Sequence, residues 1–124
     1  MKKLSEFLVW DKVSIHKNII PSITIPSKDK GWRNTLRFNK PMVEKLDSPD
    51  CVEFFEKEKS KEMHITASDK GFPLKIHKTG EATLSRIVLA NYLRKYYSDP
   101  GPFYLHIEDS DTINHGFKLV YVKK

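Results

Sequence analysis

Hydrophobic and polar residues alternate in several short stretches of the chain, and a period of two is typical of strands buried on one face. Leu36 and Phe38 alternate with Thr35 and Arg37, which predicts a strand with its apolar side chains on one side. Stretches of this kind cover residues 33–38, 51–66, 103–108 and 117–122. The second of these stretches predicts a hairpin, because a charged tip divides it into two apolar-rich runs.

Two other stretches have helical spacing. Asn39 stands at a helix cap and Pro41 falls in the first turn, where its missing N–H does no harm. Pro49 ends this short helix, whose apolar residues are Met42, Val43 and Leu46. A longer helix is predicted from Thr83 to Tyr97, since this stretch contains no glycine or proline and its apolar residues recur with helical periodicity.

The two helices occupy similar places in two similar halves. Residues 33–66 and 82–122 each combine a helix, a turn and two strands, which favours an internal pseudo-repeat. We therefore predict a single α+β domain over residues 1–124. Its strands should be mostly antiparallel, with one short and one long helix and tandem strand-helix-strand-strand halves. Residues 1–11 should add an amphipathic helical turn, and residues 13–27 short strands interrupted by prolines.

Composition places the chain among ordinary globular proteins, with 39% hydrophobic and 31% charged residues in a length of 124. No apolar run approaches the roughly 20 residues that cross a bilayer, so no membrane association is expected. The single cysteine, Cys51, cannot close an internal disulfide. These observations predict a cytoplasmic protein.

The positive charge is concentrated near the N-terminus. Residues 1–45 hold ten Lys and Arg against four Asp and Glu, which equals the net charge of +6 for the whole chain. Such an asymmetry indicates an anionic partner, nucleic acid first. The alternative is that the surplus only keeps the protein soluble.

A basic and aromatic stretch supplies the candidate binding residues. Lysine and arginine can contact phosphates, and Trp32 could stack on a base or a sugar. The candidates are Lys28, Lys30, Trp32, Arg33, Arg37 and Lys40. Two interpretations stay open, because Trp32 could instead belong to the core while the cations cover an exposed face. The same choice between core and interface applies to Tyr92, Tyr96 and Tyr97.

Catalytic and metal-binding patterns are missing from the sequence. It contains no P-loop, no GxGxxG, no G-x-S-x-G, and no HxH or HxxxH pair that would form a metal face. His64 and His106 lie between apolar residues on predicted strands, so we expect both to face solvent. We predict that the protein is not an enzyme and that it uses no metal or cofactor.

The first half resembles the swapped-hairpin family of AbrB and MazE, which are small bacterial and phage DNA-binding domains. The residues that carry the resemblance are Leu36–Phe38, Lys40, Pro41, Val43–Leu46, Asp50–Phe54 and Met63–Ile65. The chain departs from that family before its second strand, where it has Ser-Pro-Asp instead of a Gly-Asp turn. The resemblance implies two intertwined copies, which would be a homodimer or an internal pseudo-dimer, with basic residues resting on DNA.

The sequence thus leads to two functional hypotheses. The first is a protein that binds duplex DNA through its basic N-terminal third, as a regulator of phage or mobile-element origin. The second is a protein-interaction module that uses an exposed strand edge and aromatic side chains, such as an inhibitor of a host factor or an antitoxin-like binder. Both hypotheses share the fold and the charge, so only the partner separates them.

Overall fold

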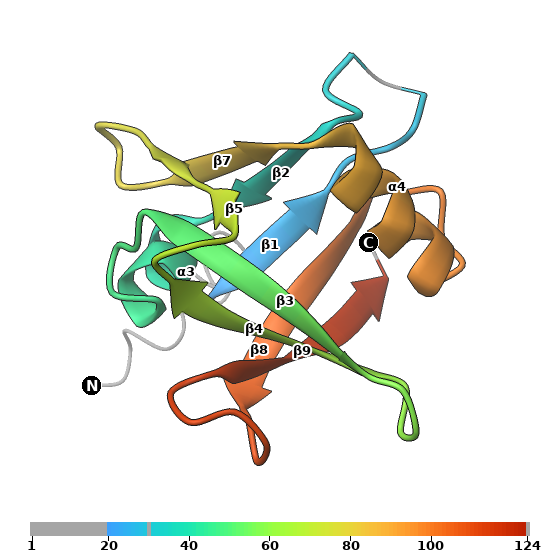
Figure 1. Ribbon diagram of the computed structural model, residues 1–124. Helices are drawn as coiled ribbons and strands as arrows, with labels where there is room; N and C mark the ends of the chain where they lie inside the picture. The colour runs from blue at the N-terminus through green and yellow to red at the C-terminus, as the bar shows by residue number, and fades with distance from the viewer. Residues whose placement is uncertain (1–19, 30, 124) are drawn as a thin grey trace, which may run out of the picture.

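The computed structural model describes residues 20–29 and 31–123, which form nine strands and two helices (Figure 1). The strands are β1 (Ser22–Ile25), β2 (Thr35–Phe38), β3 (Cys51–Lys57), β4 (Glu62–Ser68), β5 (Phe72–Pro73), β6 (Lys75–Ile76), β7 (Ala82–Ser85), β8 (Phe103–Asp109) and β9 (Phe117–Lys123). The helices are α3 (Lys40–Lys45) and α4 (Ile87–Tyr96). All nine strands belong to one antiparallel sheet with the order β5-β3-β4-β9-β8-β1-β2-β7-β6.

The sheet curls into a nearly closed, barrel-like form. Its two edge strands, β5 and β6, are separated in the chain by Leu74 alone, so the edges of the sheet lie next to each other. The backbone N–H of Leu74 donates to the carbonyl of Asp50 at 2.9 Å, which holds this crossing point against the start of β3.

The core fills the inside of this sheet with the alternate residues of each strand. On β2, Leu36 and Phe38 are fully buried while Arg37 is exposed, which confirms the alternation predicted for this strand. The same period holds on β1, β7 and β8, where the buried residues are Ile23, Ile25, Ala82, Leu84, Phe103 and Leu105. In Figure 1, α3 lies at the left of the molecule and α4 at the right, and they contribute Met42, Val43, Leu89 and Leu93 to the same core.

Helix α3 begins as the sequence predicts. The Oδ1 atom of Asn39 accepts a hydrogen bond from the N–H of Met42 at 3.0 Å, so Asn39 is a true N-cap. Its Nδ2 atom donates to the carbonyl of Ile20 at 2.8 Å, which ties the cap to the chain just before β1. Pro41 lies in the first turn, and Met42, Val43 and Leu46 are buried.

The predicted α+β class is wrong. The described residues form one curled sheet, and their two helices are only six and ten residues long, which makes this a mostly-β structure. The long helix was predicted from Thr83, but residues Ala82–Ser85 form β7 and the helix begins at Ile87. The reason is tertiary, because pairing with β2 holds these residues extended and the alternate residues Ala82 and Leu84 enter the core.

One order of elements occurs twice. The series β2-α3-β3-β4 is followed by β7-α4-β8-β9, and corresponding strands of the two series pair with each other, β2 with β7 and β4 with β9. Strand β1 bridges β2 and β8, while β5 and β6 pair with β3 and β7. The pairing of each half therefore repeats that of the other, although duplication of residues 33–66 in 82–122 stays a prediction.

Some predictions concern residues that are not described. The amphipathic turn over residues 1–11, the part of the 13–27 stretch before residue 20, and Lys30 lie outside the described residues. Among the residues that are described, no helix is long and apolar enough to cross a membrane.

Candidate nucleic-acid interface

Four strands, β1, β2, β7 and β6, carry a row of outward-facing side chains that we call the outer polar face. Strand register places Thr24 opposite Arg37, Arg37 opposite Thr83, and Thr83 opposite Lys75. These side chains point outward because their neighbours along each central strand are buried in the core. A second pair beside the row, Thr35 and Ser85, shares a hydrogen bond of 2.9 Å between hydroxyl oxygens.

Trp32 and Arg37 form the centre of this face. The indole of Trp32 is 64% exposed, so the interpretation that places Trp32 in the core is wrong. The guanidinium carbon of Arg37 lies 5.4 Å from the indole centroid, in a cation–π contact. A shallow hollow of about 370 Å³ lies beside them, and its lining also includes Thr24, Thr35 and Pro102. This hollow offers a flat aromatic wall next to a fixed positive charge.

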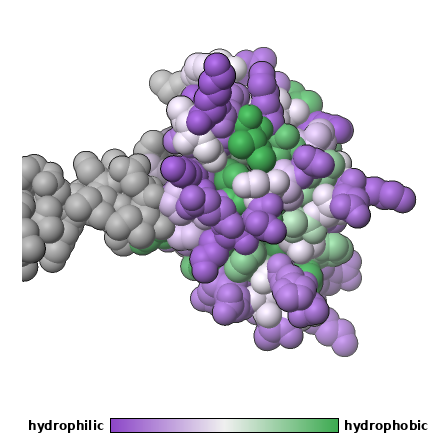
Figure 2. All heavy atoms as spheres, turned by 90° about the vertical axis from the view of Figure 1, so that its left-hand side faces the viewer, coloured by the Kyte–Doolittle hydropathy of each residue, from purple (hydrophilic) through white to green (hydrophobic). Residues whose placement is uncertain are grey.

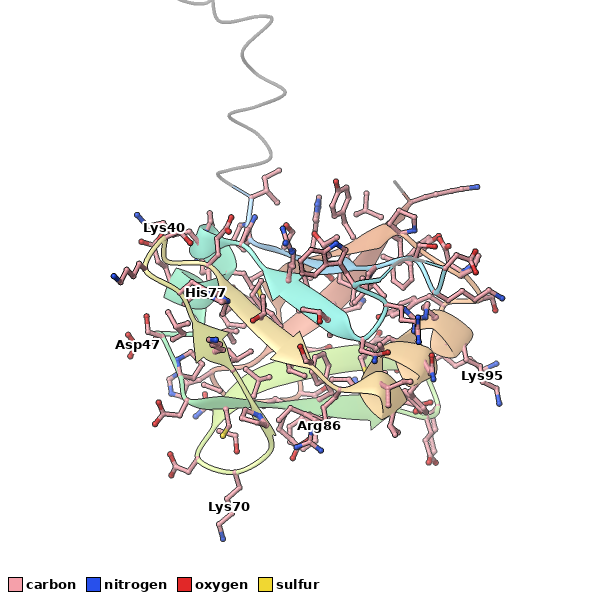
Figure 3. All side chains as sticks on the ribbon, turned by 90° about the horizontal axis from the view of Figure 1, so that it is seen from above. Lys40, Asp47, Lys70, His77, Arg86 and Lys95 are labelled. Carbon is pink, nitrogen blue, oxygen red and sulfur yellow. The ribbon has the colours of Figure 1, made fainter. Side chains whose placement is uncertain are left out.

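A cationic cluster extends the face at the end near α3. In the view of Figure 3, Lys40 and His77 lie at the same end of the molecule. The aliphatic part of Lys40 lies against Gly80, whose N–H donates to the carbonyl of His77 at 2.9 Å. His77 shares a hydrogen bond of 3.0 Å between its Nε2 atom and the hydroxyl of Thr83, which fixes the turn to β7. Exposed Lys75 and Lys78 complete the cluster.

The loop between β1 and β2 is held by a buried arginine. Arg94 of α4 is only 6% exposed, and its Nη1 atom donates to the carbonyls of Pro26 at 2.9 Å and Arg33 at 2.8 Å. Its Nη2 atom donates to Oδ1 of Asn91 at 2.7 Å. Burial, and then the charge of Arg33, lower the pKa of Arg94 from its ordinary value. The helix of the second half therefore positions the loop that carries Lys28, Trp32 and Arg33.

The predicted site residues thus fall into three places. Trp32 and Arg37 contact each other, Lys28 and Arg33 are exposed on the anchored loop, and Lys40 lies at the far end in the cationic cluster.

The sequence interpretation missed Lys75, His77 and Lys78, because they lie in the middle third of the chain, whose net charge is near zero. The run Lys-Ile-His-Lys was the available signal, but only the pairing of β6 with β7 and of β7 with β2 shows that it continues the face.

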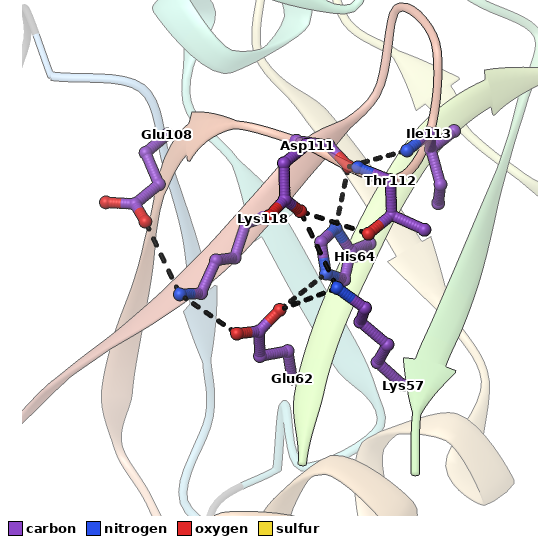
Figure 4. A network of polar contacts seen from close by, with 9 residues as sticks. Lys57, Glu62, His64, Glu108, Asp111, Thr112, Ile113 and Lys118 are labelled. Atoms are coloured by element: carbon purple, nitrogen blue, oxygen red, sulfur yellow. Dashed lines mark hydrogen bonds and ion pairs between the residues drawn. The ribbon is translucent and has the colours of Figure 1, made fainter. Parts of the chain in front are cut away.

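A second polar network lies on β4, β9 and the loop between β8 and β9 (Figure 4). His64 was expected to face solvent, but it is only 1% exposed, because its Nδ1 atom shares a hydrogen bond of 2.9 Å with the hydroxyl of Ser110 in the loop that covers it. Its Nε2 atom lies 3.2 Å from Oε1 of Glu62. His106, the other histidine expected to face solvent, is half-buried.

The carboxylates of this network already have cationic partners. Glu62, His64 and Asp111 place potential metal-ligand atoms within 4.8 Å of one another. However, the ammonium of Lys57 lies 3.7 Å from both carboxylates, and that of Lys118 lies 3.4 Å from Glu62. The hydrogen bond to His64, with these ammonium groups, lowers the pKa of Glu62. We therefore regard this cluster as an ion-pair network that joins the two halves.

Comparison with known proteins assigns no function to these sites. No protein-family model, curated protein or solved structure matches the chain. The resemblance to AbrB and MazE, and the expectations that the protein is not an enzyme and uses no metal or cofactor, stay predictions.

Proposed function

We propose that this protein binds duplex DNA through its outer polar face. The observation that carries the proposal is the position of Arg37, between the exposed indole of Trp32 and the row that leads through Thr83 to Lys75. A continuous surface that combines cations with an aromatic wall can neutralise phosphates and contact a sugar or base in one footprint. A regulatory role in a phage or a mobile element stays a prediction within this proposal.

The geometry also supports different roles for the basic side chains and for the loop that carries Trp32. Lysine and arginine side chains spread along the face would meet successive phosphates, and these contacts fix the orientation of the protein without reading sequence. The anchored loop with Trp32 projects beside them, and a two-stranded β-ribbon fits the major groove of B-form DNA. Because Arg94 holds this loop from inside, little ordering of the backbone would be needed on binding.

A salt series tests the proposal. Fluorescence anisotropy of a labelled duplex should show binding whose log K falls against log salt with a slope of about −5, for about six phosphate contacts. Neutralising Arg37 and Lys75 together, as Arg37→Gln with Lys75→Gln, should flatten the slope by roughly two. Lys59→Gln with Lys61→Gln removes the same charge from the exposed turn between β3 and β4, so this control should keep the wild-type slope.

Two outcomes would contradict the proposal. If both double variants change the slope equally, the binding depends only on net charge and not on the outer polar face. If a labelled single strand binds more tightly than the duplex, the preferred partner is not duplex DNA.

Trp32→Ala should weaken binding without changing the slope, because the indole carries no charge to release counterions.

A further inference from the structure

A groove runs between β3 and α4, away from the outer polar face. It has a volume of about 310 Å³, and none of the residues that line it also lines the hollow beside Trp32. Its floor is apolar, with Phe54 and Phe72 in edge-to-face contact, their ring centroids 6.0 Å apart. Val88 and Tyr92 of α4 form one wall. We call it the β3–α4 groove.

One wall of the groove is an open strand edge. Strand β3 pairs with β4 along its whole length, but it pairs with β5 only at Cys51 and Val52. Within the described residues, no strand pairs with the rest of that edge. The N–H of Phe54 donates to the carboxylate of its own neighbour Glu53 at 3.3 Å, so it takes no part in the ladder with β4. Alternation along the strand places the N–H of Glu56 on the same edge.

The opposite wall exposes apolar side chains that a helix normally buries. Val88 is 77% exposed and Tyr92 is 46% exposed, and their spacing of four residues puts both on one stripe of α4. Ile87 at the start of the helix is also exposed. The adjacent stripe, with Leu89 and Leu93, is buried in the core and also lines the groove. An exposed apolar patch rimmed by polar groups is typical of a protein-binding surface.

The titratable residues that line the groove include two carboxylates, while one guanidinium, that of Arg86, lies 5.9 Å from the ring centroid of Phe72 on its floor. Glu53 and Glu56 line it, and no ammonium or guanidinium group of the described residues forms an ion pair with either carboxylate. The hydroxyl of Tyr92 donates to Glu56, and this hydrogen bond raises the pKa of Tyr92. A negative rim in a protein of net charge +6 is complementary to a basic occupant.

We propose that the β3–α4 groove binds an extended peptide segment of a partner protein. The segment adds a strand to the open edge of β3, through the N–H groups of Phe54 and Glu56. It places an apolar side chain between Phe54 and Val88 and presents lysine or arginine to Glu53 and Glu56. Strand addition gives affinity through the main chain, and the pockets for alternate side chains give specificity. This site is independent of the proposed DNA contact.

A labelled peptide of alternating leucine and lysine is the probe, titrated against the full chain by fluorescence anisotropy. We expect saturable binding that Val88→Glu weakens at least about tenfold, because a carboxylate would then stand in the apolar wall. Ile76→Glu is the matched control. Like Val88, Ile76 is an exposed apolar residue, but it lies on β6 and outside the groove. It should bind the peptide as the wild type does.

Two further measurements separate charge from strand pairing and do not depend on an apolar-to-acidic change. Glu53→Gln with Glu56→Gln should weaken binding and reduce its dependence on salt, because both attractive charges are lost. A peptide of the same sequence that is N-methylated at alternate residues keeps every side chain but cannot pair with β3. We expect it to bind about tenfold more weakly.

Three outcomes would overturn the proposal. They are an absence of saturable binding, equal weakening by Val88→Glu and Ile76→Glu, or equal affinity for the N-methylated peptide. A chain that dimerises in analytical ultracentrifugation, and loses the dimer on Val88→Glu, would assign the groove to a second copy of the chain and would also overturn it.

Discussion

Helices α3 and α4 each follow a strand of the paired β2–β7 ribbon, but of the two only α4 leaves large apolar side chains exposed. Helix α3 is six residues long, is capped by Asn39 and has two of its residues buried in the core. Helix α4 is ten residues long, and the residue at its cap position, Arg86, makes no side-chain cap bond. It exposes Ile87, Val88 and Tyr92. Helix α3 therefore covers the core, whereas α4 covers the core and also exposes an apolar surface.

The difference shows how one order of elements can serve two purposes. The cap of α3 is local, because Asn39 accepts a hydrogen bond from the N–H of Met42, three residues further along the chain. The position of α4 depends on long-range bonds, because Arg94 reaches across to the loop between β1 and β2. Arg94 of the second half therefore holds in place a loop that comes just before the first half in the chain. Substitutions at four positions test this comparison and the contact between the halves.

The largest effect is expected at Arg94. Arg94→Ala would leave two part-buried carbonyls, those of Pro26 and Arg33, without this donor, and should lower the free energy of unfolding by about 3 kcal/mol. Urea denaturation measures the loss. The neighbouring Lys95 is exposed, so Lys95→Ala should stay within about 0.5 kcal/mol of the wild type. A similar loss in both variants would mean that the bonds from Arg94 do not hold the loop.

Asn39 should come second. Asn39→Ala removes the cap of α3 and the bond to the carbonyl of Ile20, and we expect a loss of about 2 kcal/mol in the same denaturation experiment. Asn114→Ala is the control, because Asn114 is exposed in the loop between β8 and β9. If the two variants unfold at the same urea concentration, the short helix does not depend on its cap.

The uncapped start of α4 offers the reverse experiment. Arg86 already has the extended backbone of a cap residue, with φ of −149° and ψ of 110°, so a serine there can bond the first turn. Arg86→Ser should therefore be more stable than Arg86→Ala by about 1 kcal/mol. Comparing two substitutions removes the common loss of the cation–π contact with Phe72. Equal thermal midpoints for the two variants would contradict the expectation.

The smallest effect should come from the exposed ion-pair network that joins the halves. The folded chain lowers the pKa of Glu62 below its ordinary value of 4.5, so its stabilisation is present above that pH and is lost as the pH falls through the folded pKa. The stability difference between the wild type and Glu62→Gln should be largest near neutral pH and shrink below about pH 4.5. A difference that stays constant from neutral to acid pH would exclude this linkage.

Local patterns in the sequence predicted the local structure well. The alternation around Arg37 and the cap at Asn39 are each set by residues close in the chain, and both are confirmed. Thr83 was assigned to a helix because its pairing partner, Arg37, is 46 residues away in the chain and leaves no local signal. His64 was expected in solvent for a similar reason, since the loop that covers it begins at Ser110.

The candidate site was predictable only in part. Trp32 and Arg37 could be singled out from a basic and aromatic run, although their contact could not. Lys75 joins them only because β6, β7 and β2 are neighbours in the sheet. The class of fold was missed because the pattern predicts strands but does not say that β5 and β6 meet through Leu74.

The pairing of strands that are far apart in the chain has a consequence for how the chain folds. Strand β2 needs β7, β4 needs β9, and β1 needs β8, so every one of these ladders waits for a segment synthesised much later. Closing such long loops before these ladders can form slows folding. Residues 20–70, expressed alone, would keep the β1–β2 and β3–β4 pairs, but each of these four strands would lose its other partner. They would either aggregate or pair with a second fragment of the same kind, and supplying residues 71–124 in the same cell should rescue them by complementation.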